Sequence, residues 1–238
     1  MMATIFTALQ GVQERIADAC LRNHRESSGV VLLAVSKTFP SSDIRALYLT
    51  GQRNFGENYV QELIEKHAAL SDCKALVWHF IGPLQSNKTR SVAELADWVH
   101  SIDRLKVVER LSAQRPEHLP DLNVCIQINV SGEVSKSGIS PDECLELASK
   151  ICQLPRIKLR GLMCIPEASR DAVHLASQFK ILRNLQSQLM SHDITLDVLS
   201  MGMSSDLEIA ISEGSTLVRI GTALFGSRTT KPSDTPPN

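Results

Sequence analysis

Residues 30–37 read Val30-Val31-Leu32-Leu33-Ala34-Val35-Ser36-Lys37, which is six apolar residues followed by a serine and a lysine. A short apolar run that is rich in valine predicts a strand buried on both faces of a parallel sheet. Pro40 ends the segment, because a proline cannot donate a hydrogen bond within a central sheet. Lys37 is therefore expected at the carboxyl end of a buried strand, where α/β proteins place their functional residues.

Similar segments recur along the chain, with amphipathic segments between them. We expect strands at residues 30–37, 53–56, 76–81, 98–102, 124–130, 158–165, 195–199 and 217–220. We expect helices at residues 5–19, 41–50, 57–70, 87–96, 103–114, 140–153, 171–190 and 205–214. Eight strands that alternate with helices predict a single α/β domain, a (β/α)₈ TIM barrel. An open doubly wound sheet is the alternative, but no Gly-x-Gly-x-x-Gly fingerprint follows any of the strands.

Two helix starts fit the capping-box pattern, Ser140-Pro141-Asp142-Glu143 and Ser205-Asp206-Leu207-Glu208. We also expect Asp103 to cap the helix that follows it. The barrel, with its N-terminal helix, is expected to occupy residues 1–228. Residues 229–238 contain three prolines and no periodic pattern, so we expect a disordered tail there.

The composition excludes several classes of function. A net charge of −1 gives no electrostatic basis for binding nucleic acid or an anionic membrane. No apolar stretch approaches the ~18 residues of a membrane span, and the N-terminus lacks the apolar region of a signal peptide. The six cysteines form no Cys-x-x-Cys pair, which favours reduced thiols and a cytoplasmic location over a disulfide framework or a zinc site.

The loops after the last two expected strands have the features of phosphate sites. Ser200-Met201-Gly202-Met203-Ser204-Ser205 follows the seventh strand, and Gly221-Thr222-Ala223 follows the eighth. TIM barrels often bind phosphate at these two loops, where small residues expose backbone N–H groups. A plain helix cap is the alternative for the first loop taken alone.

Two residues in the expected strands could contribute a nucleophile and a ring contact. Removing an ammonium group from water is costly, so a lysine at the end of a buried strand tends to have a lowered pKa and to form Schiff bases. Lys37 could also be an ordinary solvated lysine. Arg219 lies between two apolar residues of the last strand, so it must pair with a carboxylate, such as Glu57 or Asp206, or face a ligand. A Schiff-base lysine, a phosphate site and an arginine that leaves a pyridine nitrogen unprotonated together suit pyridoxal 5′-phosphate (PLP).

The sequence also closely resembles the pyridoxal phosphate homeostasis protein family, which is related to the barrel domain of alanine racemase and to the other fold type III PLP enzymes. The resemblance covers nearly the whole chain, in residues 33–38 (LAVSKT), 55–62 (FGENYVQE), 78–88 (WHFIGPLQSNK), 135–138 (SKSG), 160–163 (RGLM), 199–204 (LSMGMS) and 218–226 (VRIGTALFG). It implies Lys37 as the internal aldimine and Arg219 at the pyridine nitrogen. It also implies Asn58 as a pocket residue near Lys37, and it implies a phosphate site made by Ser200, Ser204, Gly221 and Thr222.

The resemblance implies a protein that binds PLP and acts in vitamin B6 and amino-acid homeostasis without established turnover, with PLP-dependent apoenzymes as candidate recipients. Alanine racemases add a C-terminal β-domain that supplies a second acid/base tyrosine. We expect no such domain here, because only residues 227–238 follow Gly226, and we therefore expect a monomer. A weak racemase that uses Tyr59 as its second base is the alternative. A class I aldolase would instead need a lysine on a later strand.

Three further residues have two interpretations each. Lys88 and Lys136 lie in the matching segments and could touch a ligand, although loop lysines are usually only solvated. His79, between bulky apolar residues of the third strand, is expected to be a core histidine with its hydrogen bonds satisfied rather than a catalytic group.

Overall fold

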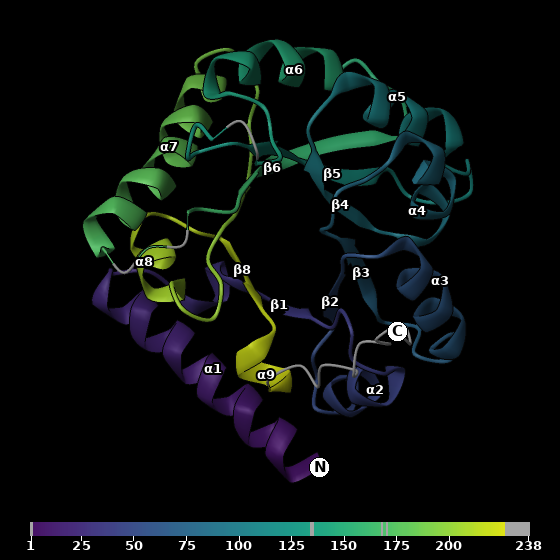
Figure 1. Ribbon diagram of the computed structural model, residues 1–238, viewed down its shortest axis with the longest axis vertical. Coiled ribbons are helices and arrows are strands. Elements are labelled where there is room, and N and C mark those ends of the chain that lie inside the picture. The colour runs from purple at the N-terminus through teal and green to yellow at the C-terminus, as the bar shows by residue number, and fades with distance from the viewer. Residues whose placement is uncertain (1, 134–135, 168, 170, 227–238) are drawn as a thin grey trace, which may run out of the picture.

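Eight parallel strands form a closed barrel inside a ring of helices (Figure 1), as expected from the sequence. The computed structural model describes residues 2–133, 136–167, 169 and 171–226. The strands are β1 (Val31–Val35), β2 (Asn54–Glu57), β3 (Val77–Phe80), β4 (Trp98–Ile102), β5 (Leu122–Ile128), β6 (Ile157–Cys164), β7 (Val198–Ser200) and β8 (Leu217–Ile220). They follow one another in chain order around the barrel, and β8 pairs with β1 to close it. In that closing register, Leu33 of β1 lies opposite Arg219 of β8.

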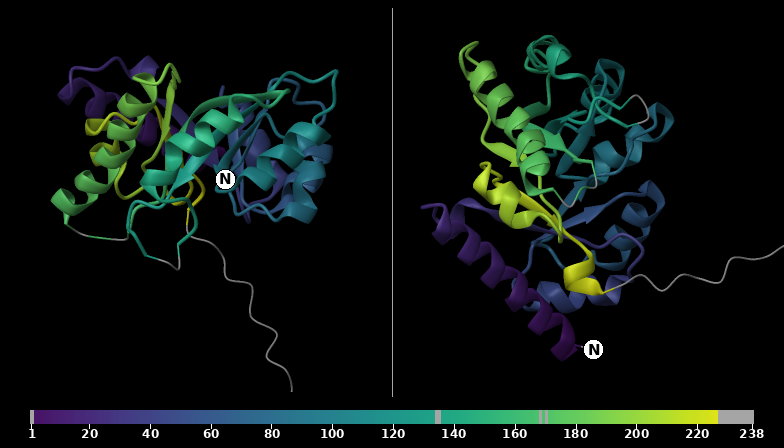
Figure 2. Two further views of the ribbon diagram at one scale, coloured as in Figure 1. Left: turned by 90° about the horizontal axis from the view of Figure 1, so that it is seen from above. Right: turned by 60° about the vertical axis from the view of Figure 1, so that its left-hand side comes forward.

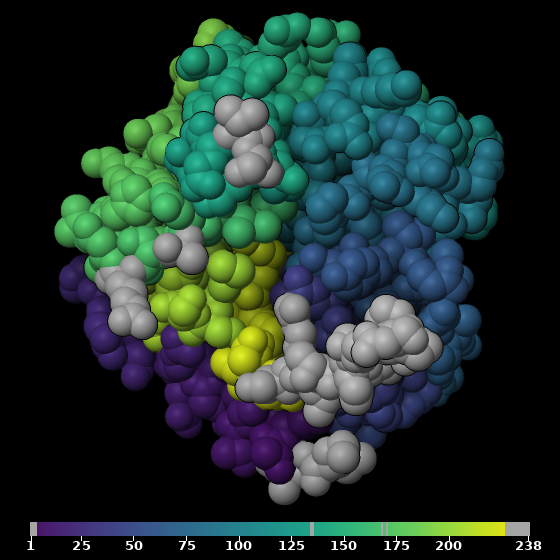
Figure 3. Space-filling model, in the orientation of Figure 1, coloured from purple at the N-terminus to yellow at the C-terminus, as the bar shows by residue number. Residues whose placement is uncertain are grey.

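Helices lie on the outside of the barrel, and within the described residues all but the first and the last connect consecutive strands. They are α1 (Met2–Arg22), α2 (Ser41–Leu49), α3 (Val60–Ala69), α4 (Thr89–Leu95), α5 (Leu105–Gln114), α6 (Cys144–Ile151), α7 (Ala172–Met190), α8 (Leu207–Ser212) and α9 (Thr222–Phe225), with short 3₁₀ turns η1 (Ser27–Gly29), η2 (Ser86–Lys88) and η3 (Pro141–Glu143). Figure 2 shows α1 along the outer wall, where it packs on α8 and α9. The first and last elements of the described chain thus lie side by side, as the purple and yellow surfaces of Figure 3 show.

Two apolar clusters form the core. The larger one lies between the strands and the helices and takes side chains from both. The smaller one is formed by strand residues that point into the barrel, namely Leu33, Cys125, Met163, Val198 and Leu217. Several polar side chains of the strands are also buried, among them His79, His100 and Arg219. In the described part of the chain, no helix is both long and apolar enough to cross a membrane.

Several local expectations were wrong. Glu57 does not open a helix: it ends β2, where its carbonyl accepts a hydrogen bond from Ile81 N at 2.9 Å, and α3 starts at Val60. Strand β5 starts two residues earlier than expected, and β7 is shifted to Val198–Ser200. Asp103 does not cap α5, because its carboxylate binds the side chain of Arg104, which precedes that helix.

One capping box is confirmed and the other is wrong. The Glu143 carboxylate accepts a hydrogen bond from Ser140 N at 2.9 Å, and the capping box is complete. At the second site, Asp206 precedes α8 and its carboxylate accepts from Met203 N instead. Glu208 does not take part in a capping box because it pairs with Arg15 of α1 at 2.7 Å. The expected tail, residues 229–238, lies outside the described residues.

Candidate functional site

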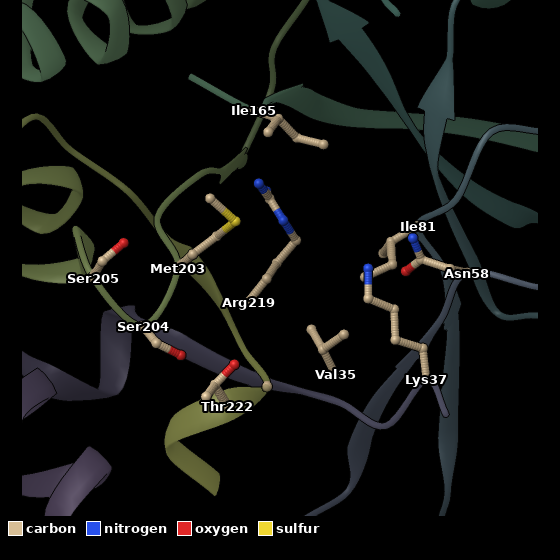
Figure 4. Close-up of a pocket in the computed structure, with 11 residues that line it drawn as sticks. Val35, Lys37, Asn58, Ile81, Ile165, Met203, Ser204, Ser205, Arg219 and Thr222 are labelled. Carbon is tan, nitrogen blue, oxygen red and sulfur yellow. The ribbon is translucent and has the colours of Figure 1, made fainter. Parts of the chain in front are cut away.

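A cavity of about 460 Å³ opens at the carboxyl ends of the barrel strands. Its lining comes from the ends of β1, β2, β3, β6, β7 and β8: Val35, Lys37, Asn58, Ile81, Ile165, Met203, Ser204, Ser205, Arg219, Gly221 and Thr222. Figure 4 shows Lys37 and Asn58 on one side, Arg219 across from them, and the Ser204 and Thr222 hydroxyls near each other at a third position. The cavity therefore brings together six of the seven residues expected from the sequence.

The backbone on the N-terminal side of Lys37 is held by side chains from β2 and α3. The buried Ser36 hydroxyl donates to Glu57 Oε1 at 2.6 Å. The Ser36 carbonyl accepts from Lys66 Nζ at 2.8 Å. Because both bonds fix the residue just before Lys37, they fix where the Lys37 side chain leaves the strand.

The backbone on the C-terminal side of Lys37 is held by the same group of charges. Thr38 N donates to Glu62 Oε2 at 2.8 Å. Thr38 has a φ of 70°, a left-handed conformation that is uncommon for a residue other than glycine and that needs such support. Lys66 Nζ completes the group, 2.8 Å from Glu57 Oε1 and 2.7 Å from Glu62 Oε2.

The two carboxylates of this group have opposite pKa shifts. Glu57 is fully buried, and desolvation raises its pKa from 4.5 to about 7 despite the opposing effects of Lys66 and Ser36. Partial burial also acts to raise the pKa of Glu62, but hydrogen bonds from Lys66 and from Thr38 N outweigh it and lower that pKa. One ammonium shared by two carboxylates thus leaves Glu57 as the one that takes up a proton more readily.

Asn58 follows β2 and lines the cavity beside Lys37 (Figure 4). Its Oδ1 atom is buried, and no group in the described part of the chain donates a hydrogen bond to it. A buried amide oxygen without a donor costs about 1–3 kcal/mol. A bound ligand or water molecule that donates a hydrogen bond to Asn58 Oδ1 would therefore be stabilised at this position.

Arg219 lies on the opposite side of the cavity and is 5% exposed. Its Nη1 donates to the carbonyl and the hydroxyl of Ser200, and its Nη2 donates to the Cys164 carbonyl at 2.7 Å. Neither carboxylate considered above is its hydrogen-bond partner, because Glu57 binds Lys66 and Asp206 binds Met203 N. Burial lowers the pKa of Arg219, an effect that Asp206 partly opposes. The guanidinium is therefore held by neutral acceptors at the cavity wall.

The third part of the cavity is formed by the loops after β7 and β8. Thr222 is the first residue of α9, and Gly221 precedes it. Ser204 faces them, and its carbonyl accepts a hydrogen bond from Arg15 Nη2 of α1 at 3.0 Å. Gly202 turns this loop at a φ of +96°, and a Cβ there would lie 2.6 Å from Ala210 Cβ. Two hydroxyls and a glycine backbone at this place suit a phosphate group.

Ser200 is the expected residue that does not line this cavity. It is fully buried at the end of β7, and its hydroxyl lies 2.8 Å from both His100 Nδ1 and Arg219 Nη1. His79 is buried as expected and has a polar partner at each ring nitrogen, His100 and Asn54.

Three other residues that the sequence offered as a second base or as ligand contacts also lie outside the cavity. Tyr59 and Lys88 line a neighbouring groove, in which the Tyr59 side chain is 55% exposed. Lys136 pairs with Glu133 at 3.0 Å.

Sequence reasoning missed the apolar walls of the cavity. Ile81 and Ile165 come directly after β3 and β6, and Met203 lies three residues before Asp206. Position after a barrel strand was the available signal, since the lining of such a site comes from these loops. The Glu62–Lys66 contribution was also missed, although the two residues have the i,i+4 spacing of a helical ion pair.

Comparison with known proteins finds a matching family model and close relatives over most of the chain. A family model described as "Alanine racemase, N-terminal domain" matches residues 16–229, a range that includes all eight strands of the barrel. The pyridoxal phosphate homeostasis protein of Pseudomonas aeruginosa is 55% identical over 229 residues, which are 95% of this chain and 97% of that protein. The protein of the same name from Escherichia coli K12 is 51% identical, over 92% of this chain and 95% of its own length.

A solved structure of a similar protein has the same fold. PipY of Synechococcus elongatus PCC7942 with PLP bound is 39% identical and superposes with a TM-score of 0.79, over 90% of this chain and all of that one. Within the class of alanine racemase-like barrels, the chain belongs to the pyridoxal phosphate homeostasis protein family.

Proposed function

We propose that this protein binds PLP in the cavity and acts as a PLP carrier in vitamin B6 homeostasis. The main supporting observation is that Lys37, Arg219 and the Ser204–Thr222 hydroxyl pair face one cavity from three sides. These are the three chemical groups that an aldehyde, a pyridine nitrogen and a phosphate need. Relatives named for PLP homeostasis and the PLP-bound PipY structure support the same function.

In this proposal each side chain has a defined task. The Lys37 amine condenses with the aldehyde carbon of PLP, so that a C=N bond forms and one water molecule leaves. Arg219 donates a hydrogen bond to the ring nitrogen and cannot supply a proton to it, which leaves that nitrogen neutral. Ser204, Gly221 and Thr222 bind the phosphate. When bound, PLP supplies an aldehyde that reacts reversibly with amines.

The buried Oδ1 atom of Asn58, which has no hydrogen-bond donor in the described part of the chain, supports the fit of PLP to the site. Its Oδ1 needs a donor, and its Nδ2 can donate to an oxygen next to the aldehyde. A ligand group or a water molecule carried in with PLP would remove the cost of the unpaired oxygen.

A carrier rather than an enzyme is supported by the cavity lining. Two-base racemisation needs a second proton donor on the other face of the ring. Among the described residues that line the cavity, Lys37 is the one ordinary acid–base group, since Arg219 does not release its proton. Tyr59, the alternative second base, lies in the neighbouring groove. We further propose a cytoplasmic monomer that passes PLP to apoenzymes.

The test is PLP titration of the apoprotein, followed at the absorption band near about 420 nm that a lysine–PLP adduct gives. Lys37→Ala should abolish the band, whereas Lys88→Ala and Lys136→Ala should keep it as matched controls. Borohydride reduction followed by peptide mapping should place the label on Lys37. A band of normal intensity in Lys37→Ala would disprove the assignment.

Turnover is tested separately. Amino acids incubated with the loaded protein in deuterated water should keep their Cα protons. Clear exchange accompanied by racemisation would favour the racemase alternative instead.

A further inference from the structure

A chain of polar side chains crosses the inside of the barrel and ends at Arg219. Asn54 Oδ1 lies 3.0 Å from His79 Nε2, and His79 Nδ1 lies 2.9 Å from His100 Nε2. His100 Nδ1 lies 2.8 Å from Ser200 Oγ, which in turn lies 2.8 Å from Arg219 Nη1. The chain thereby links β2, β3, β4, β7 and β8.

Arg219 determines the direction in which the hydrogen bonds run. A guanidinium can only donate, so Ser200 Oγ accepts from Arg219. The Ser200 hydroxyl proton is then donated to His100 Nδ1, which makes Nε2 the protonated nitrogen of His100. His100 Nε2–H donates to His79 Nδ1, and His79 Nε2–H donates to the oxygen of Asn54. In this arrangement the Ser200 hydroxyl and the N–H group of each imidazole ring meet an acceptor.

The opposite direction leaves a buried group unsatisfied. If His100 Nδ1 donated to Ser200 Oγ, that oxygen would accept two hydrogen bonds, and its own proton would have no acceptor among the described side chains of the chain. Ser200 and His100 are fully buried, so no solvent could replace the lost bond. An unsatisfied buried donor costs more than a typical hydrogen bond contributes.

Both histidines must be neutral in this arrangement, because an imidazolium would turn a donor toward a donor. Burial supports this, since it lowers the pKa of His79 to about 3. The pKa of His100 is also well below its usual value, through burial first and then through electrostatic repulsion from its neighbours His79 and Arg219. The Trp98 ring stacks on the His79 ring, with 5.4 Å between the ring centroids, and covers that face of the imidazole.

We propose that His79, His100 and Ser200 are positioning residues that fix the guanidinium of Arg219, so that its remaining N–H groups meet a heteroaromatic ring nitrogen in the cavity. Nη1 uses its two hydrogens on Ser200, and Nη2 uses one on Cys164. The other Nη2 hydrogen and the Nε hydrogen are left to face a ligand. In this role Ser200 orients Arg219 and does not contact phosphate. The proposal rests on the proposed function for the identity of the ligand.

The first test needs no PLP. Nitrogen-15 NMR of the histidine side chains in the apoprotein should show His79 and His100 as neutral rings protonated at Nε2, down to about pH 5, well below the usual histidine pKa. A ring protonated at Nδ1, or an imidazolium at neutral pH, would overturn the proposed direction.

The second test uses Ser200→Ala, with Ser112→Ala as the matched control. Both serines are buried and each loses one hydroxyl, but Ser112 donates to the Pro155 carbonyl outside the cavity, at 2.6 Å. With PLP labelled at the ring nitrogen, the wild type and Ser112→Ala should give the shift of an unprotonated pyridine. Ser200→Ala should change that shift and raise the Kd for PLP about threefold to tenfold.

Variants of His100 separate positioning from packing. His100→Leu should behave like Ser200→Ala, whereas His100→Asn, whose amide oxygen can still accept from Ser200, should restore the wild-type shift. If His100→Leu fails to fold by circular dichroism, Ser200→Ala decides. An unchanged nitrogen shift in folded Ser200→Ala would overturn the positioning role alone. Wild-type protein whose borohydride-reduced PLP label does not map to Lys37 would instead overturn the proposed function, and the histidine spectrum of the apoprotein would still test the hydrogen-bonded chain.

Discussion

Replacing Glu57 by glutamine should remove a pH-dependent penalty from the stability of the protein. Glu57 is fully buried, and its pKa in the folded state is raised from 4.5 to about 7. At about pH 5 the folded protein holds this proton, and the glutamine amide is a close neutral substitute for the protonated carboxyl. The two proteins should therefore have similar stabilities there.

The difference develops as the pH rises. Between the unfolded and folded pKa values the folded state binds the proton and the unfolded state does not, so the free energy of unfolding falls with increasing pH. At about 1.4 kcal/mol per pKa unit, the rise from 4.5 to about 7 corresponds to a loss of about 3 kcal/mol above neutral pH. Glu57→Gln lacks this loss, so its stability relative to the wild type should increase by up to about 3 kcal/mol between about pH 5 and pH 8.

Urea unfolding followed by circular dichroism at a series of pH values measures this difference. Glu62→Gln is the matched control, because Glu62 binds the same lysine at 2.7 Å but has a lowered pKa. The stability that the Glu62 carboxylate contributes is lost only as the pH falls through that lowered value. The difference between this control and the wild type should therefore change much less between about pH 5 and pH 8 than that of Glu57→Gln, and the remaining change comes from the Glu62 charge, which helps to raise the pKa of Glu57. A pH-independent difference for Glu57→Gln, or one of the opposite sign, would refute the reasoning.

Three further predictions concern the same site and its supports. Lys66→Met leaves two carboxylates without their buried ammonium and should lower the free energy of unfolding at neutral pH by about 3–5 kcal/mol in urea titrations. Gly202→Ala forces a Cβ to within 2.6 Å of Ala210 Cβ at a φ of +96°, and it should cost about 2–5 kcal/mol. The comparison is Gly11→Ala inside α1, where nothing lies within 4 Å of the new Cβ and a gain of about 0.5–1 kcal/mol is expected. Thr222→Val keeps the side-chain volume but loses the hydroxyl, and it should raise the Kd for PLP by about tenfold or more, measured by absorbance titration, with thermal stability unchanged.

The barrel and most of the cavity lining could be predicted because their signals are local. A run such as Val31–Val35 identifies a buried strand without knowledge of its neighbours, and the residues just after such strands are the ones that meet at one end of a barrel. Lys37, Arg219 and Thr222 were found in this way, and all three line one cavity.

The contacts between distant side chains could not be predicted in this way. The second capping box fitted the local pattern, yet Arg15, from the other end of the chain, engages Glu208. Ser200 fitted a phosphate loop, but its hydroxyl lies 2.8 Å from Nδ1 of His100, a neighbour that only barrel closure brings near. In both places a tertiary partner competes with a local one for the same polar group, and sequence spacing carries no information about that competition.

Lys37 and Arg219 are supported by two separate buried networks of different electrical character. The network at Lys37 contains an ammonium and two carboxylates, and one of its members has a pKa of about 7. The network at Arg219 consists of neutral imidazoles and a hydroxyl whose hydrogen bonds run in one direction. If the supports are independent, Glu57→Gln should change the pH dependence of stability and leave the PLP ring-nitrogen shift unaltered. Ser200→Ala should do the reverse. A variant of one network that produces the signature of the other would show that the two sides of the cavity are coupled through the barrel.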